Sequence, residues 1–174
     1  MPFLTQIAEI TECLYLSSIY AITRERLLEL QITDIINCTL KDPSLSRNEL
    51  NLKITWFQIS DNPQSPLDEH FDKAADIIND VNSCGGKVLV HCVAGGSRSA
   101  TLCIAYLMKY KQMKLKEAHD FVKGKRKIIQ PNSGFWEQLI IYERKLFGTN
   151  TVAMVKSNNE SIPDIYIEQK KVIP

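Results

Sequence analysis

The sequence predicts a single α/β domain in which a central, mostly parallel, twisted sheet is flanked by helices. Short apolar segments of β type alternate with helical patterns along the chain, as expected for strands joined by helical crossovers. One of these segments enters a helix through a glycine-bearing loop, so Val88–Met108 forms a strand–loop–helix unit. The chain of 174 residues, 44% hydrophobic and 24% charged, is long enough to bury one sizeable core.

The first half of the chain carries four strand-like segments and one short helical pattern. Lys53–Ile59 alternates and is β-branched or aromatic, which predicts a strand, and Ser60–Pro66 after it contains two prolines, which predicts a loop. The remaining elements are a hairpin of Ile7–Ile10 with Leu14–Leu16, a helix over Thr23–Leu30 and a buried strand over Asp34–Cys38.

Helical patterns dominate the second half. Apolar residues at helical spacing from Phe71 to Val81 predict a helix that stops at the two glycines before the strand Lys87–Val90. Further helices are expected over Ala100–Met108, Leu115–Val122 and Phe135–Leu146.

Helical periodicity is lost after residue 147. We therefore expect a domain over residues 1–147 and an extension over residues 148–174, with a polar linker at Lys156–Ser161. The sequence leaves open whether this extension packs on the domain, contacts a partner or stays loose.

The loop His91–Ser99 has the features of a site for one phosphate group. A loop that opens a helix directs backbone N–H groups at a common centre, and the helix dipole favours an anion there. Gly95 and Gly96 permit backbone conformations that a side chain forbids, and Arg98 supplies a planar fork of donors. We expect phosphate to bind to this arginine and to the loop residues Val93, Ala94, Gly95, Gly96, Ser97 and Arg98.

Cys92 is the predicted nucleophile of this loop. The field that binds phosphate also favours the thiolate form of a cysteine, which attacks phosphorus to give a phosphocysteine. Ser99 is placed to donate to the sulfur as it leaves, His91 to hydrogen-bond to the loop backbone, and Ser97 to stabilise the loop. The alternative, an inert buried cysteine, does not explain the glycines and the arginine at cradle spacing.

These residues resemble a known signature. The pattern His-Cys-x-x-Gly-x-Ser-Arg-Ser is similar to that of the cysteine-dependent protein tyrosine phosphatases, and the continuation Ser99–Met108 resembles the dual-specificity branch. Pro131–Leu139 is similar to the same branch, and Ile162–Tyr166 resembles the atypical subgroup numbered fourteen, eighteen and twenty-one. The resemblance covers the chain from Ile7 to Tyr166.

The resemblance implies a general acid on a second loop. Transfer of phosphate to sulfur requires a protonated leaving group, and Asp61 in the loop Ser60–Pro66 stands where the family carries its acid. Asp61 is then the base that activates water. A turn or capping aspartate is the other interpretation of Asp61, and Asp68 is a competitor that looks like a helix-start residue. The resemblance also makes Asn132 a supporting residue.

The chain departs from the family pattern near the loop. Gly96 stands where the subgroup usually has a bulky apolar residue, and a second glycine is expected to loosen the cradle and slow catalysis. Lys127 and Gln130 replace a common proline and arginine. Arg126 and Lys127 remain candidates for binding a second substrate phosphate, or form a solvated basic helix end.

The resemblance implies that phosphorylated proteins, with kinases of signalling cascades among them, are the substrates. A shallow cleft, expected because no additional N-terminal segment is seen, would admit phosphotyrosine, phosphoserine and phosphothreonine. Rival interpretations are a phosphatase acting on lipid or RNA, or a module that binds phosphoproteins. The neutral residues from Val93 to Gly96 argue against a lipid substrate.

Composition indicates which partners and which cellular compartment we expect for the chain. A net charge of +1 gives no argument for nucleic acid, and no apolar run is long enough to span a bilayer. Five cysteines without paired spacing fit a reducing compartment. We expect a cytoplasmic enzyme without metal or cofactor, with the nucleus, mitochondrial association and the oligomeric state left open.

Overall fold

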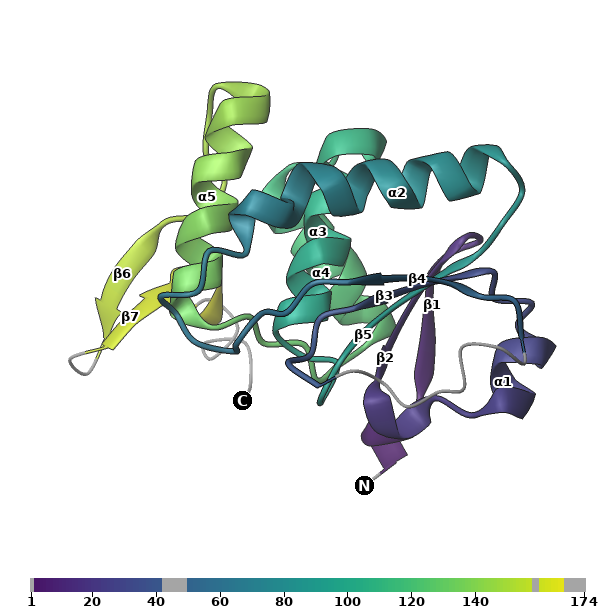
Figure 1. Cartoon of the computed structure of the whole chain (residues 1–174). Coiled ribbons are helices and arrows are strands. Elements are labelled where there is room, and N and C mark those ends of the chain that lie inside the picture. Colours follow the sequence, from purple (N-terminus) through teal and green to yellow (C-terminus); the bar gives the residue numbers. More distant parts are fainter. Residues whose placement is uncertain (1, 42–49, 158–159, 168–174) are drawn as a thin grey trace.

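The computed structural model describes residues 2–41, 50–157 and 160–167. Its centre is a five-stranded sheet in the order β1-β2-β5-β3-β4 (Figure 1). The strands are β1 (Ile7–Thr11), β2 (Leu14–Ser18), β3 (Asp34–Asn37), β4 (Lys53–Trp56) and β5 (Val88–Cys92). Strands β2, β5, β3 and β4 run parallel to one another, and β1 pairs with β2 in an antiparallel hairpin. The predicted mostly parallel sheet is therefore confirmed.

Helices cover both faces of this sheet unequally. The helices α2 (Phe71–Ser83), α3 (Arg98–Lys111), α4 (Leu115–Lys125) and α5 (Ser133–Phe147) lie on one side, and the short α1 (Arg24–Glu29) lies on the other (Figure 1). The described residues also include three 3-10 turns, at Pro2–Leu4, Ile19–Ala21 and Asp68–His70.

Alternation along the strands divides the apolar side chains between two cores. On β5, Val88 and Val90 face the large core under α2–α5, whereas Leu89 faces the small core under α1. Neighbouring strands follow the same period of two, as Leu14 and Leu16 alternate with Tyr15 on β2. The central strand is consequently buried on both faces, which holds its carboxyl end rigidly.

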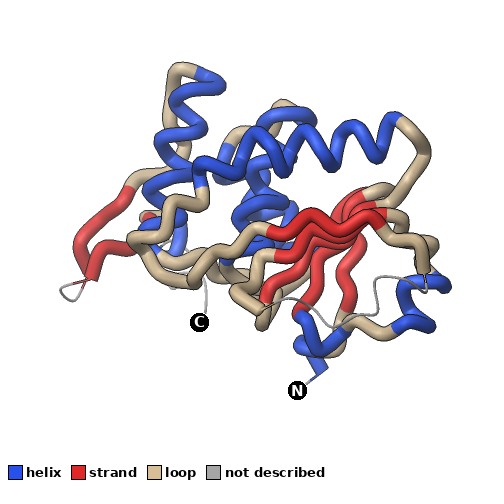
Figure 2. The backbone as a smooth tube through the Cα atoms, in the orientation of Figure 1, coloured by secondary structure: helices blue, strands red, loops and turns tan. Residues whose placement is uncertain are grey.

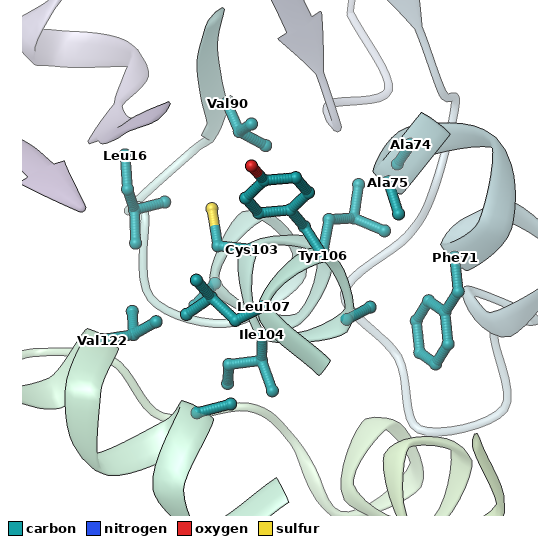
Figure 3. Packing of buried hydrophobic residues seen from close by; sticks show 14 of the residues in the cluster. Leu16, Phe71, Ala74, Ala75, Val90, Cys103, Ile104, Tyr106, Leu107 and Val122 are labelled. Carbon is teal, nitrogen blue, oxygen red and sulfur yellow. The ribbon is translucent and has the colours of Figure 1, made fainter. Parts of the chain in front are cut away.

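Helix α3 runs through the middle of the large core. Every residue from Arg98 to Met108 is buried. Figure 3 shows Cys103, Tyr106 and Leu107 of this helix between the sheet residues Leu16 and Val90 and side chains of α2 and α4. The helix therefore fixes the loop from which it begins.

Most element boundaries differ from the sequence prediction by a few residues. Strand β4 ends at Trp56 because the amide of Ile59 turns back to the carbonyl of Phe57 at 2.9 Å and leaves the sheet. Helix α3 begins at Arg98 and α4 extends to Lys125. These shifts leave the order of elements unchanged.

The predicted polar linker is wrong where the structure describes it. Lys156 and Ser157 end β6 (Met154–Ser157), and Glu160 and Ser161 begin β7 (Glu160–Pro163), so that the segment is a hairpin. Asn158, Asn159 and residues 168–174 lie outside the described residues. Val152 and Ile165 are each 2% exposed within the large core, so the described part of the extension packs on the domain.

Across residues 2–41, 50–157 and 160–167, we find no helix with the length and apolar character needed to cross a membrane.

Candidate active site

The loop between β5 and α3 lies where the parallel strands end, and loops lead from this edge of the sheet to the helices (Figure 2). Gly95 has a φ of +70°, and a Cβ atom at this position would lie 2.4 Å from the carbonyl oxygen of Ser17. Only glycine allows the loop to approach β2 this closely. The resulting curve brings the amide of Gly95 back over the end of β5.

Cys92 is the last residue of β5 and is 1% exposed. Its Sγ accepts hydrogen bonds from the amide of Gly95 at 3.2 Å and from the hydroxyl of Ser99 at 3.1 Å. Two donors aimed at one sulfur stabilise the thiolate. Burial raises the pKa of the Cys38 and Cys103 thiols, because a charged thiolate there loses its hydration.

Arg98 is buried beside the loop with its guanidinium plane fixed by the backbone. Its Nη1 donates to the carbonyl oxygens of Cys38 and Ile59, each at 3.1 Å. Its Nε is buried without a hydrogen-bond partner among the described residues, at 3.6 Å from Asp61 Oδ2. A buried donor that lacks an acceptor is positioned for an oxygen of a bound phosphate.

Asp61 lies over the loop, as required of a group that reaches the leaving oxygen. Its Oδ1 accepts from Ser97 Oγ at 2.7 Å and from Asn132 Nδ2 at 2.9 Å. Asn132 also caps α5, because its Oδ1 accepts from the amide of Phe135 at 3.0 Å. The carboxylate is 37% exposed, and therefore open toward solvent and substrate.

Gly134 allows the Asp61 loop to rest on the first turn of α5. A Cβ atom at Gly134 would lie 1.8 Å from the carbonyl oxygen of Pro63, two residues after Asp61. The sequence analysis missed this contact. The available signal was the glycine directly before the helix predicted over Phe135–Leu146, which the structure places in the first turn of α5, where helix propensity does not favour glycine.

Arg126 does not bind a second substrate phosphate, and that hypothesis is wrong. The side chain is fully buried and donates from Nε to the Gly95 carbonyl at 2.8 Å and from Nη2 to the Ala94 carbonyl at 3.0 Å. Its Nη1 donates to the Gln6 carbonyl at 3.0 Å. Since the loop carbonyls of Ala94 and Gly95 accept from this cation, Arg126 stabilises the backbone of the loop. Lys127 is exposed.

His91 does not form the predicted hydrogen bond. The ring is fully buried, and neither ring nitrogen has a hydrogen-bond partner among the described residues. Burial lowers the pKa of His91 to about 4. The neighbouring backbone of Cys92 raises this pKa and the positive charge of Arg98 lowers it, but both effects are smaller than that of burial. His91 is consequently a neutral packing residue beneath the loop.

Gly96 occupies a braced part of the loop. Its carbonyl accepts from the amide of Gln130 at 2.7 Å, and its φ is not positive. A Cβ atom there would meet only the Ile128 carbonyl oxygen, at 3.2 Å. This bracing argues against the expected loosening. Val93 and Ala94 are exposed at the mouth of the loop.

A cleft of about 640 Å³ opens beside the loop. Its lining combines Asp61 and Ser97 with the residues of β7 and with Tyr166. The other lining residues are Gln130, Pro131, Asn132, Ser133 and Trp136. Within the described residues, no three His, Cys, Asp or Glu side chains gather in a way that could hold a metal ion.

Comparisons with known proteins agree with this geometry. Residues 14–145 match the family described as "Dual specificity phosphatase, catalytic domain". Human dual specificity protein phosphatase 18 is 45% identical, covering 99% of this chain and 91% of that protein. Human dual specificity protein phosphatase 14 is 43% identical over 95% of this chain and 83% of its own.

Solved structures of the same fold are also similar. Human DUSP28 superposes with a TM-score of 0.76 at 30% identity, covering 80% of this chain and 94% of that one. The human tyrosine phosphatase-like serine/threonine/tyrosine-interacting protein superposes with a TM-score of 0.73 at 32% identity, over 80% of this chain and 96% of that one.

Proposed function

Because the chain belongs to the dual-specificity phosphatase family, we propose that it hydrolyses phosphotyrosine, phosphoserine and phosphothreonine in proteins through a phosphocysteine on Cys92. One observation carries this proposal. The sulfur that accepts two hydrogen bonds lies at the floor of a phosphate-sized loop, and a carboxylate is held over the same loop. The names of the relatives support the substrate class.

In the first step, Cys92 Sγ attacks phosphorus while the bond from phosphorus to the ester oxygen breaks. The amides of the loop and Arg98 hold the three other phosphate oxygens and stabilise the charge that they carry in the transition state. Asp61, protonated, gives its proton to the departing oxygen, so the side chain of the substrate leaves as an alcohol or phenol.

In the second step, water attacks the phosphorus of the phosphocysteine and the bond from sulfur to phosphorus breaks. Asp61, now a carboxylate, takes the proton from this water. The hydroxyl of Ser99 is 3.1 Å from Sγ and donates to the sulfur as negative charge returns to it. Inorganic phosphate then leaves, and the thiolate is restored.

Ser97, Asn132 and Arg126 act as positioning residues in this scheme. Ser97 and Asn132 aim the carboxylate of Asp61, and Arg126 holds the loop carbonyls outward so that the amides point inward. His91 supports the loop by packing. The substrates that we propose include kinases of signalling cascades, met in the cytoplasm.

The experiment that tests this function compares wild type with Cys92→Ser and Asp61→Ala on aryl phosphates, phosphopeptides and phosphoinositides. We expect Cys92→Ser to abolish turnover, because a hydroxyl is not ionised near neutral pH. Asp61→Ala should slow esters with poor leaving groups by about 100-fold or more, and activated aryl phosphates far less.

Three results contradict parts of the proposal. Equal losses for both kinds of leaving group remove Asp61 from the acid role. A strong preference for phosphoinositides replaces the protein substrates by lipid. Binding of phosphopeptides without any turnover of aryl phosphates makes the chain a binding module, the class to which the name of the phosphatase-like interacting protein points.

A further inference from the structure

Strand β7 presents one of its edges to the cleft beside the catalytic loop. Its four consecutive residues, Glu160–Pro163, all line the cleft that also contains Asp61 and Ser97. Side chains alternate between the two faces of a strand. If only one face of β7 lined the cleft, every second residue would be in the lining, so the run of four residues indicates that an edge of the strand faces the cleft. We propose that this edge binds the substrate polypeptide next to the phosphorylated residue as an extended third strand. The inference rests on the proposed phosphatase function and names how its substrate is held.

The register of the hairpin identifies the backbone groups available for this pairing. β6 and β7 are antiparallel, with Lys156 opposite Ser161 and Val155 opposite Ile162. The amide of Asp164 donates to the carbonyl of Ala153 at 2.9 Å. Hydrogen-bonded pairs alternate along such a ladder, so Val155 and Ile162 form a bonded pair. The N–H and C=O of Ser161 therefore point away from β6, toward the cleft.

That edge is unpaired in the part of the chain that the structure describes, since β6 and β7 form a sheet of two strands. In Figure 1 the hairpin stands at the side of the molecule, with β7 between β6 and α5. An unpaired edge with free N–H and C=O groups is a template for an extended chain. The cleft supplies the space for such a chain, and its lining includes both Asp61 and Ser97, of which Ser97 belongs to the catalytic loop.

The charge of the cleft indicates which peptides fit. Its described lining contains the carboxyl groups of Asp61 and Glu160 but no lysine, arginine or histidine. Glu160 is exposed. A basic side chain in the flanking segment is therefore favoured over an acidic one or a second phosphate. Trp136 and Tyr166 form a fixed apolar floor, because the indole Nε1 donates to the Tyr166 hydroxyl at 3.1 Å.

Two proline variants separate this edge from the rest of the hairpin. Ser161→Pro removes the N–H that faces the cleft without removing a bond to β6. Lys156→Pro is the matched control, because Lys156 is the partner of Ser161 in the ladder and its N–H points to the opposite edge. Ser161→Ala controls for loss of the hydroxyl alone.

The assay measures kcat/KM of the full chain on a phosphotyrosine peptide with arginines on both sides and on p-nitrophenyl phosphate. We expect Ser161→Pro to lower kcat/KM for the peptide about three- to tenfold, the loss of one net hydrogen bond. Lys156→Pro and Ser161→Ala should match wild type. Turnover of p-nitrophenyl phosphate should be unchanged in all three variants, which also shows that they fold.

Modified peptides provide the second arm. N-methylation of single backbone amides should reduce kcat/KM at alternate positions on one side of the phosphotyrosine only. Replacing arginine with glutamate on that side should reduce kcat/KM more in wild type than in Glu160→Gln, which keeps only the carboxyl group of Asp61 in the lining of the cleft.

The inference is overturned if Ser161→Pro turns over the peptide like wild type, or if Lys156→Pro loses as much as Ser161→Pro. If wild type is inactive on both substrates, the proposed phosphatase function itself is wrong. Failure of this inference and failure of the proposed function are therefore distinguishable.

Discussion

Arg126 and Gly95 are joined by a hydrogen bond of 2.8 Å from the guanidinium Nε to the loop carbonyl, 31 residues away in the chain. The same side chain donates to Ala94 and Gln6. A fully buried cation thus links the phosphate loop to the segment before β1. It turns the loop carbonyls outward and leaves the amides free to bind phosphate.

Replacing this cation should impair both stability and catalysis. Arg126→Met leaves three carbonyl oxygens without their donor, and we expect a loss of about 3 kcal/mol or more in the free energy of unfolding. We expect kcat/KM for p-nitrophenyl phosphate to fall by about 100-fold, because the amides lose their preorganised direction. Urea unfolding and steady-state kinetics measure the two effects. Lys127→Met, at the exposed neighbour, should change neither, and an equal loss there would exclude the bracing role.

The two loop glycines should respond differently to alanine. Gly95→Ala places a Cβ atom against the Ser17 carbonyl at a positive φ and should abolish most activity. Gly96→Ala meets one carbonyl oxygen at 3.2 Å, so we expect kcat/KM within about threefold of wild type. Steady-state kinetics on p-nitrophenyl phosphate measure kcat/KM for both variants and for wild type. A large gain in rate for Gly96→Ala would instead show that Gly96 loosens the loop.

Gly134→Ala should mimic the loss of the general acid. The new methyl group displaces the chain at Pro63 and with it Asp61. We expect esters with poor leaving groups to slow by about 100-fold while activated aryl phosphates change little. Gly124→Ala in α4 is the control, because nothing lies near its Cβ position and alanine stabilises a helix by up to about 1 kcal/mol. Equal slowing of both ester types by Gly134→Ala would point to general damage.

The buried ring of His91 should make stability depend on pH. Burial lowers its pKa to about 4 in the folded chain, against about 6.5 in the unfolded chain. The unfolded state therefore binds the proton first, and the stability present above pH 6.5 is lost as the pH falls toward 4. The contribution is at most about 3 kcal/mol.

His91→Phe tests this dependence. The unfolding free energy of wild type minus that of the variant should fall by about 3 kcal/mol from pH 7 to pH 4, because only wild type loses the contribution of His91. His70 and His119, whose pKa values burial also lowers, remain in both proteins and cancel. Parallel stability curves would contradict the assignment.

Local patterns in the sequence predicted most of the sheet and the centre of the site. Strand, loop and helix around Cys92 are adjacent in the chain, and periodicity and glycine content report such short-range structure. The family resemblance singled out Asp61, but the hydrogen bond that it accepts from Ser97 was not predicted. The hairpin was missed because Lys156–Ser161 is polar throughout and pairs at the surface, where no apolar alternation marks the strands.

The roles of Arg126 and Gly134 could not be predicted from local pattern. Arg126 reaches Gln6 across 120 residues, and a buried arginine has the same sequence signature as an exposed one. Gly134 approaches Pro63 from a helix that propensity alone would fill with alanine. Both depend on contacts between distant segments, which exist only once the fold has formed.

Trapping the phosphoenzyme tests the central claim most directly. Ser99→Ala should slow the second step, because the departing sulfur loses its donor at 3.1 Å. Rapid acid quench of this variant with p-nitrophenyl phosphate, followed by peptide mass spectrometry, should then find one phosphate on Cys92. Turnover with phosphate on another residue, or on none, would contradict a phosphocysteine mechanism for this chain.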